Sequence, residues 1–278
     1  MRKGIGTGGF SAGMSLKEIF NQAKEFGFEG VELWLALSGE VTPDMTTEKI
    51  EEIKKDAKDA GIELYSLASG LGWEFSLVSN DEKERELAKT YVKRQLDIAS
   101  ALGCETILIV PGHTGVDFAP NLGIVEYDVA YEHSQAALRE LAPYAEKSGV
   151  VIGVENVWNK FLLTPLEMKK FIDEIGSPYV QSYFDVGNVL VNSYPEHWIK
   201  ILGSRIKKVH FKDFKRSIGN LDGFCDLLAG DVDYKAVKAA FDSIGYDNWV
   251  TAELAPYSSD NTVQLRHTSL AMDYILSL

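Results

Sequence analysis

Residues 150–185 have the sequence VVIGVENVWNKFLLTPLEMKKFIDEIGSPYVQSYFD. This stretch contains two apolar runs, Val150–Glu155 and Val180–Asp185, with the composition of buried strands. Between them, Thr164 is followed by a proline, a pair typical of a helix start, and Gly176 is typical of a helix end. The segment therefore predicts a strand, a helix and a second strand that runs parallel to the first.

The same unit recurs along the whole chain. Amphipathic stretches with apolar residues at intervals of three and four separate the strand candidates, and a glycine precedes most of these strands. No linker or low-complexity segment divides the sequence, so residues 1–278 are predicted to form one domain, a (β/α)₈ TIM barrel. The predicted strands are Lys3–Gly6, Gly30–Leu35, Glu63–Ala68, Thr106–Val110, Val150–Glu155, Val180–Asp185, Lys207–Lys212 and Trp249–Leu254.

An open doubly wound sheet is the alternative α/β architecture. Such a fold usually has a glycine-rich phosphate-binding turn after its first strand. The segment Gly6–Phe10 is rich in glycine, but it lacks the spacing of a dinucleotide-binding turn and is interpreted as a tight exit from a strand. The closed barrel is therefore preferred.

Composition and charge limit the classes of function. The formal net charge of −13 disfavours binding to nucleic acid, because such a surface repels phosphate backbones. No apolar run is long enough for a membrane span, and the N-terminal residues do not resemble a secretory signal. Cys104 and Cys225 are expected at opposite ends of the barrel, hence as reduced thiols, and a cytoplasmic location is expected.

Ligand-type residues lie at the ends of the last four predicted strands. Active-site groups of βα barrels lie at the C-terminal ends of the strands, and side chains alternate between the two faces of a strand. This alternation directs Glu155, Asp185, His210 and Glu253 into the same mouth of the barrel. Three carboxylates this close would repel one another unless a cation joined them. The sequence thus predicts one divalent metal, with Mn²⁺ preferred and Mg²⁺, Co²⁺ or Zn²⁺ as alternatives.

Several motifs resemble those of the sugar-phosphate isomerase/epimerase superfamily, whose barrels are xylose isomerase-like. They are Gly-Val-Glu155-Asn, Phe-Asp185-Val-Gly-Asn188, Val-His210-Phe-Lys-Asp213 and Ala-Glu253-Leu, and the similarity extends over essentially the whole chain. The superfamily includes ketose 3-epimerases, L-xylulose-5-phosphate 3-epimerases and endonuclease IV. Its members are often dimers or tetramers, so the resemblance also implies a possible homo-oligomer.

The resemblance implies roles for these residues. The glutamates that match Glu155 and Glu253 bind the metal in the epimerases, and they also remove a proton from the substrate carbon and return it on the opposite face. Asp185 and His210 would then serve as ligands alone. Arg216, just beyond the seventh strand, is a candidate for binding a hydroxyl or phosphate of the substrate.

Two departures from the family pattern indicate which activities of the superfamily this chain is expected to have. Several relatives have a histidine three residues after the aspartate of the sixth strand, where this chain has Asn188, and the Asp-Val-Gly-Asn pattern suggests the pentulose-phosphate epimerases. Endonuclease IV needs a histidine-rich set for three zinc ions, whereas this chain has five histidines in all. A DNA-repair endonuclease is therefore disfavoured.

Other residues are candidates for the wall of the substrate pocket. Aromatic faces stack on the C–H surfaces of sugars, and basic side chains or a histidine in a βα loop can bind hydroxyl or phosphate groups. Each of these side chains has a plain alternative as loop packing or as a surface charge. The candidates, in addition to Asn188 and Arg216, are Glu32, Trp34, Trp73, His113, Trp158 and Lys160.

Together these patterns predict a metal-dependent epimerase that acts at C3 of a ketose or ketose phosphate. An aldose–ketose or keto-inositol isomerase could use the same site, because the two reactions differ in the carbon that receives the proton. A sugar-binding barrel without catalytic activity is a third possibility. The expected partner is a small sugar or sugar phosphate.

Overall fold

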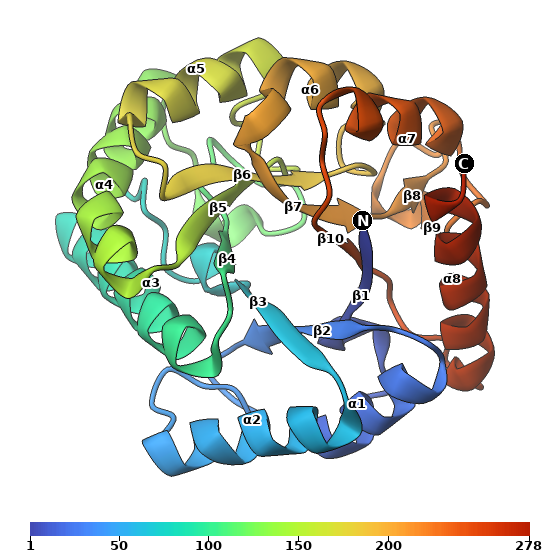
Figure 1. Ribbon diagram of the computed structural model, residues 1–278. Helices are drawn as coiled ribbons and strands as arrows, with labels where there is room; N and C mark the ends of the chain where they lie inside the picture. Colours follow the sequence, from blue (N-terminus) through green and yellow to red (C-terminus); the bar gives the residue numbers. More distant parts are fainter.

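Eight parallel strands close into a barrel in the computed structural model, which describes residues 1–278 (Figure 1). Neighbours along the chain are neighbours around the ring, and the first strand closes the barrel against the last. This confirms the predicted (β/α)₈ fold. The strands are β1 (Arg2–Gly6), β2 (Gly30–Leu35), β3 (Glu63–Ser69), β4 (Thr106–Ile109), β5 (Val151–Glu155), β6 (Val180–Asp185), β7 (Ile206–Phe211) and β10 (Trp249–Ala252).

Eight α-helices form a ring around the barrel (Figure 1). Each helix follows a barrel strand and returns the chain to the opposite end of the barrel. The predicted strand ends differ from the observed ones by at most two residues; the last strand, for example, ends at Ala252 rather than Leu254. The helices are α1 (Leu16–Glu25), α2 (Thr47–Ala60), α3 (Glu82–Leu102), α4 (Tyr127–Ser148), α5 (Pro165–Ile175), α6 (Pro195–Leu202), α7 (Tyr234–Ser243) and α8 (Asn261–Leu276).

The helix ends have the local chemistry that their residues predict. Ser15 forms a capping box with Glu18 at the start of α1, and the Thr164 hydroxyl accepts a hydrogen bond from the Glu167 N–H. Four helices end at a glycine in the left-handed conformation, which residues with a Cβ adopt at a cost. These C-terminal residues are Gly61, Gly103, Gly149 and Gly176.

Large aromatic side chains fill the interior of the barrel. The Tyr65 hydroxyl lies 2.7 Å from the Thr251 hydroxyl, and its ring stacks on Trp249 with centroids 4.1 Å apart. Gly4 on β1 makes room for this ring, because a Cβ at that position would lie 2.1 Å from the Tyr65 hydroxyl oxygen. Gly153 likewise makes room for the ring of Tyr183. These glycine–tyrosine pairs let a narrow barrel hold bulky, hydrogen-bonded residues.

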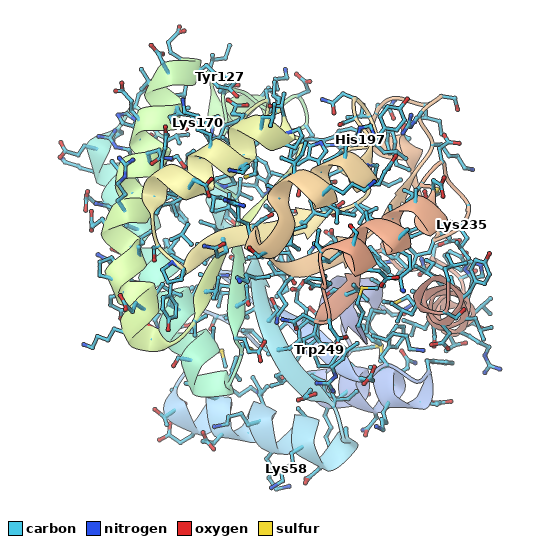
Figure 2. All side chains as sticks on the ribbon, turned by 45° about the horizontal axis from the view of Figure 1, so that its top comes forward. Lys58, Tyr127, Lys170, His197, Lys235 and Trp249 are labelled. Carbon is cyan, nitrogen blue, oxygen red and sulfur yellow. The ribbon has the colours of Figure 1, made fainter.

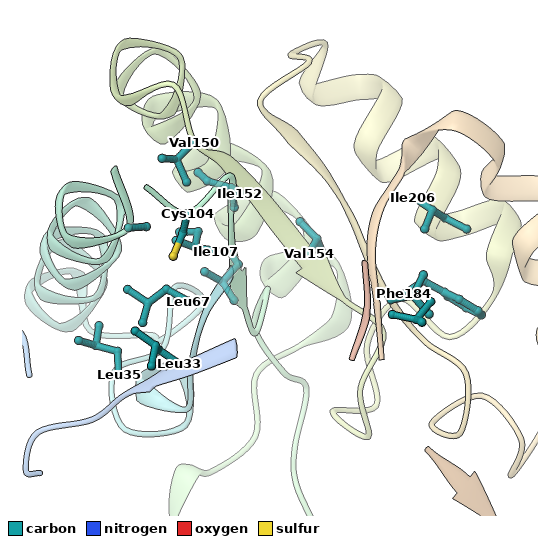
Figure 3. Close-up of a cluster of buried hydrophobic side chains, with 14 of the residues drawn as sticks. Leu33, Leu35, Leu67, Cys104, Ile107, Val150, Ile152, Val154, Phe184 and Ile206 are labelled. Carbon is teal, nitrogen blue, oxygen red and sulfur yellow. The ribbon is translucent and has the colours of Figure 1, made fainter. Parts of the chain in front are cut away.

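A second apolar layer lies between the strands and the helices (Figure 3). It contains the outward-facing strand residues, among them Leu33, Leu67, Ile107, Ile152 and Phe184. The buried Cys104 belongs to this layer, whereas Cys225 is half-buried, and both are free thiols.

The outer faces of the helices are polar. Lys58, Lys170 and Lys235 are exposed there (Figure 2). None of the helices combines the length and the apolar character needed to span a bilayer.

One small element was not predicted. After β7, the strand β8 (Asp213–Phe214) pairs antiparallel with β9 (Phe224–Cys225). The Asp213 carboxylate holds this hairpin by accepting the backbone N–H groups of Phe214, Leu228 and Val232 at 2.8, 3.0 and 3.1 Å. The hairpin forms one lip of the mouth of the barrel.

Candidate metal centre

Four ligand-type side chains meet at the C-terminal mouth of the barrel. Glu155 ends β5, Asp185 ends β6, His210 lies on β7, and Glu253 follows β10 directly. These strands are consecutive around the ring, in the order β5, β6, β7, β10. One nitrogen or oxygen atom from each residue lies within 4.8 Å of the corresponding atoms of the other three. The structure thus brings together the four residues that the sequence indicated.

Strand register explains why these residues converge. Asp185 pairs with His210 across β6 and β7, and Thr251 pairs with His210 across β7 and β10. Thr251 points into the barrel, so Glu253, two residues later, points inward one level closer to the mouth. A slip of one residue in any of these pairings would turn the ligand-type side chain toward the helices.

Glu32, from β2, lies behind the imidazole of His210. Its Oε1 is 2.7 Å from His210 Nε2, and its other oxygen accepts a hydrogen bond from the Tyr183 hydroxyl. Because Nε2 is held in this way, Nδ1 faces the acids and lies 3.0 Å from Glu253 Oε2 and 3.8 Å from Asp185 Oδ2. Such a carboxylate–histidine pair fixes the orientation of a ring and makes its free nitrogen a better ligand.

Two asparagines hold the acids of β5 and β6. The Asn188 side chain donates to Glu155 Oε1 at 3.2 Å, and its backbone N–H donates to Asp185 Oδ1 at 2.7 Å. Asn156 exchanges two hydrogen bonds with the backbone of Asp185, at 2.8 and 2.9 Å. Both acids are therefore held by asparagines, and the second oxygen of Asp185, Oδ2, faces His210 Nδ1 and Lys212 Nζ.

The atoms that face the centre of the cluster satisfy the requirements of a cation site. Asp185 Oδ2, His210 Nδ1 and Glu253 Oε2 are buried, yet none makes a hydrogen bond of acceptable geometry. These atoms contact one another and Lys212 at 2.7 to 3.8 Å, so several charges are crowded into one buried site. Carboxylate oxygens with one imidazole nitrogen suit a divalent cation such as Mn²⁺, Mg²⁺, Co²⁺ or Zn²⁺. The donor set therefore fits a divalent metal.

Lys212 is the one lysine or arginine side chain within the cluster. Its Nζ lies 2.7 Å from Glu253 Oε2 and 3.4 Å from Asp185 Oδ2, and it also lies over the ring of Phe224. In the structure its charge offsets that of the carboxylates.

Burial and mutual charge displace the pKa values of the cluster in opposite directions. Burial, with the nearby charge of Glu253, raises the pKa of Glu155 to about 8. Burial raises the pKa of Asp185 to about 6, although Lys212 works against this shift. Burial alone would also raise the pKa of Glu253, but the positive charges of Lys212 and His210 outweigh it and hold that pKa well below its usual range. Two carboxyl groups with opposite pKa shifts are a common feature of sites for proton transfer.

The cluster opens into a cavity of about 1240 Å³. Glu32, Trp34, His210, Lys212 and Glu253 all line it. Trp34 stands in this cavity because residue 70 is a glycine: a Cβ there would lie 2.8 Å from the Trp34 Cζ2 atom. The remaining walls come from the loop after β1, from the β8–β9 hairpin and from the segment after β10. Trp34 is thus well placed to pack on a sugar.

Other predicted pocket residues line a second, neighbouring cavity of about 510 Å³. Trp158 donates its indole N–H to the Asn188 carbonyl at 2.8 Å, and Lys160 Nζ lies 2.6 Å from Asp117 Oδ1. Asn188 lies at the border between this cavity and the cluster, because it lines the cavity and also contacts Glu155.

Three predicted contacts line neither of these cavities. Trp73 packs edge-on against Phe118 with centroids 5.3 Å apart, and His113 is buried. The guanidinium of Arg216 stacks over the ring of Tyr194 at 4.6 Å and donates to the Ser193 carbonyl at 3.3 Å.

Several residues of the site were not predicted from the sequence. Tyr183 supports Glu32, Asn156 anchors Asp185, and Phe10, Asp226 and Tyr257 line the larger cavity. The inward parity of β6 identifies Tyr183 as an interior residue, but its hydrogen-bond partner is distant in the sequence. The residues of the loops have no periodic signal that could have indicated them.

Comparison with known proteins places this arrangement in context. Residues 20–272 match a family model described as a xylose isomerase-like TIM barrel. Fructoselysine 3-epimerase of Escherichia coli O157:H7 is 24% identical over 271 residues, which cover 89% of this chain and 90% of that protein. SgbU of Escherichia coli K12, assigned provisionally as an L-ribulose-5-phosphate 3-epimerase, is 25% identical over 256 residues, covering 84% of this chain and 81% of that one.

A comparison with solved structures shows the same fold. D-psicose 3-epimerase from Clostridium cellulolyticum H10, crystallised with D-tagatose, superposes with a TM-score of 0.84 at 20% identity, over 99% of each chain. The barrel and its connections are therefore shared along the entire length.

Proposed function

Because this chain belongs to the xylose isomerase-like TIM barrel family, we propose that it is a divalent-metal-dependent enzyme that inverts the configuration at C3 of a ketose or ketose phosphate. The observation that carries this proposal is the convergence of Glu155, Asp185, His210 and Glu253, each of which offers one ligand atom within 4.8 Å of the other three. The names of the relatives, which are 3-epimerases, support the choice of C3.

The positions of the two glutamates suit an inversion. Glu155 and Glu253 belong to the first and last of the four consecutive strands, with Asp185 and His210 between them. One glutamate would take the proton from C3, and the other would deliver a proton to the opposite face, so that the composition of the sugar is unchanged. When bound, the cation would act as a Lewis acid that makes a C–H bond beside a carbonyl easier to ionise.

The remaining residues position these groups. Asp185 and His210 complete the ligand set, and Glu32 holds the His210 ring with Nδ1 toward the metal. Asn188 holds Glu155 through the hydrogen bond to Oε1. Trp34 provides an aromatic wall for the sugar.

The proposal is tested by stripping the protein with a chelator, restoring it with Mn²⁺ and supplying ketoses and ketose phosphates in deuterated water. We expect deuterium at C3 of the 3-epimer and no aldose. Glu155→Gln and Glu253→Gln should each reduce kcat by about 100-fold or more, whereas the exposed Glu51→Gln serves as a control and should retain full activity.

Other outcomes would favour the alternatives. An aldose product, with label at C2 or C1, would indicate an isomerase that uses the same cluster. Sugar binding without turnover, unaffected by Glu253→Gln, would indicate a sugar-binding barrel and would refute the proposal.

A further inference from the structure

We propose that the substrate is a ketose that carries no phosphate and no other negative charge. This inference rests on the proposed function and concerns the chemistry of the cavity above the metal centre. A phosphate on the terminal carbon of a ketose would lie at the far end of the sugar from C2 and C3, so the outer wall of the cavity decides whether it is accepted.

Lys212 is the only lysine or arginine that lines the cavity. Its Nζ lies at the base of the cavity, 2.7 Å from Glu253 and 3.4 Å from Asp185. It therefore belongs to the reacting end and cannot also serve a group at the outer end. Phosphate sites usually contain arginine or lysine, and no second side chain of either kind lines the cavity.

The helix starts beside the cavity are already occupied by acidic side chains. Phosphates in βα barrels often bind at a helix N-terminus near the last strands. Here Asp260 accepts the Thr262 N–H at the start of α8, at 3.0 Å. At the start of α1, Glu40 accepts the Leu16 N–H at 2.6 Å. A phosphate would have to compete with a carboxylate at each of these positions.

The outer wall also carries a negative charge of its own. Asp226, on the lip formed by the β8–β9 hairpin, accepts hydrogen bonds from the Tyr257 hydroxyl and from Gln264 Nε2, the latter at 3.3 Å. Phe10 and Trp34 line the same cavity. Aromatic faces and an acid bind the C–H and hydroxyl groups of a neutral sugar, or an amine, and they repel an anion.

Two other basic residues near the mouth, Lys160 and Arg216, are engaged elsewhere. Lys160 lines the neighbouring cavity and pairs with Asp117, whereas Arg216 contacts Ser193 and Tyr194. The Lys160–Asp117 pair is exposed. The phosphate of a long substrate could therefore displace the Asp117 carboxylate from Lys160.

The test compares each sugar with its own phosphate ester on the Mn²⁺-loaded full chain. D-fructose is paired with D-fructose 6-phosphate, and L-ribulose with L-ribulose 5-phosphate. We expect kcat/KM to be at least tenfold higher for the free sugar in a pair that reacts. Asp226→Asn should reduce this ratio several-fold, because it removes the negative charge and keeps the shape. Asp97→Asn is the matched control, since Asp97 also accepts from a tyrosine hydroxyl, that of Tyr144, but on the outer helices; its ratio should not change.

Each outcome bears on one of the two proposals. Equal or faster epimerisation of a phosphate ester overturns the present inference while the proposed function stands, and loss of that preference in Lys160→Met would locate the phosphate in the neighbouring cavity. If no member of either pair is epimerised, the proposed function fails for these sugars, and equilibrium dialysis of the same pairs decides the charge preference. Tighter binding of the free sugar supports the inference, and tighter binding of the ester refutes it.

Discussion

The carboxylate of Glu32 and the imidazole of His210 lie 2.7 Å apart although 178 residues separate them in the sequence. The pair joins β2 to β7 across the interior of the barrel, and both side chains are buried. Its consequence is that Nδ1 of His210, rather than Nε2, faces Asp185 and Glu253.

We expect Glu32→Gln to weaken Mn²⁺ binding by about 10- to 100-fold, which is the usual effect of losing the partner of a metal-binding histidine. Titration calorimetry on the metal-free protein measures the dissociation constant. Glu146→Gln, an exposed change on α4, is the control for the loss of one negative charge. An unchanged dissociation constant in Glu32→Gln would show that the pair does not orient a ligand.

Metal binding should become tighter as the pH rises from 6 to 8. The pKa of Glu155 is raised to about 8 and that of Asp185 to about 6, so both carboxyl groups hold protons at low pH that a metal must displace. Each displaced proton makes the affinity increase by about tenfold per pH unit below the pKa of its group. Calorimetry in buffers of different ionisation enthalpy counts the protons released. An affinity independent of pH over this range would exclude Glu155, whose pKa is raised to about 8, as a ligand.

Gly4→Ala should destabilise the barrel by about 1–3 kcal/mol, because the new Cβ would lie 2.1 Å from the Tyr65 hydroxyl oxygen. Urea denaturation measures the free energy of unfolding. Gly6→Ala on the same strand is the control, since the nearest atom to a Cβ there is 3.8 Å away. Adding Tyr65→Phe to Gly4→Ala should recover part of the loss; a double variant no more stable than the single one would show that the hydroxyl is not the obstacle.

His113 should make the folded protein less stable in mild acid. Burial lowers the pKa of His113 below its ordinary value of 6.5, so the unfolded chain binds this proton more readily than the folded one. The free energy of unfolding therefore falls as the pH drops below about 6.5, by up to about 1.4 kcal/mol per pH unit. In His113→Gln the slope between pH 5 and 6.5 should be smaller. His267→Gln, which changes an exposed histidine, should leave the slope as it is.

The sequence supported detailed predictions wherever a local pattern determines the structure. The alternation of residues along β6 and β10 correctly indicated that Asp185 and Glu253 face inward, because side-chain direction within a strand follows from parity alone. The short hairpin of Asp213–Phe214 with Phe224–Cys225 was not predicted. Its strands have two residues each and are held by the Asp213 carboxylate, so they have no periodicity to detect.

Side-chain partners at long range could not be predicted in this way. Arg216 lies close in sequence to His210, yet its guanidinium stacks on Tyr194 and not in the cavity. Lys212, two residues from His210, points into the cluster and pairs with Glu253. Loop conformation decides between such positions, and a loop has no fixed relation between residue number and direction.

The amino-acid sequence by itself determined the eight βα units, the order of the strands and the inward direction of Glu155, Asp185, His210 and Glu253, because these follow from periodicity, helix-end chemistry and the pleat of a strand. Only the tertiary structure decided that Glu32 supports His210, that Asn188 holds Glu155 and that Lys212 lies among the acids. Those contacts depend on the register between strands and on the paths of the loops, which bring residues far apart in the chain within hydrogen-bonding distance only when the barrel closes.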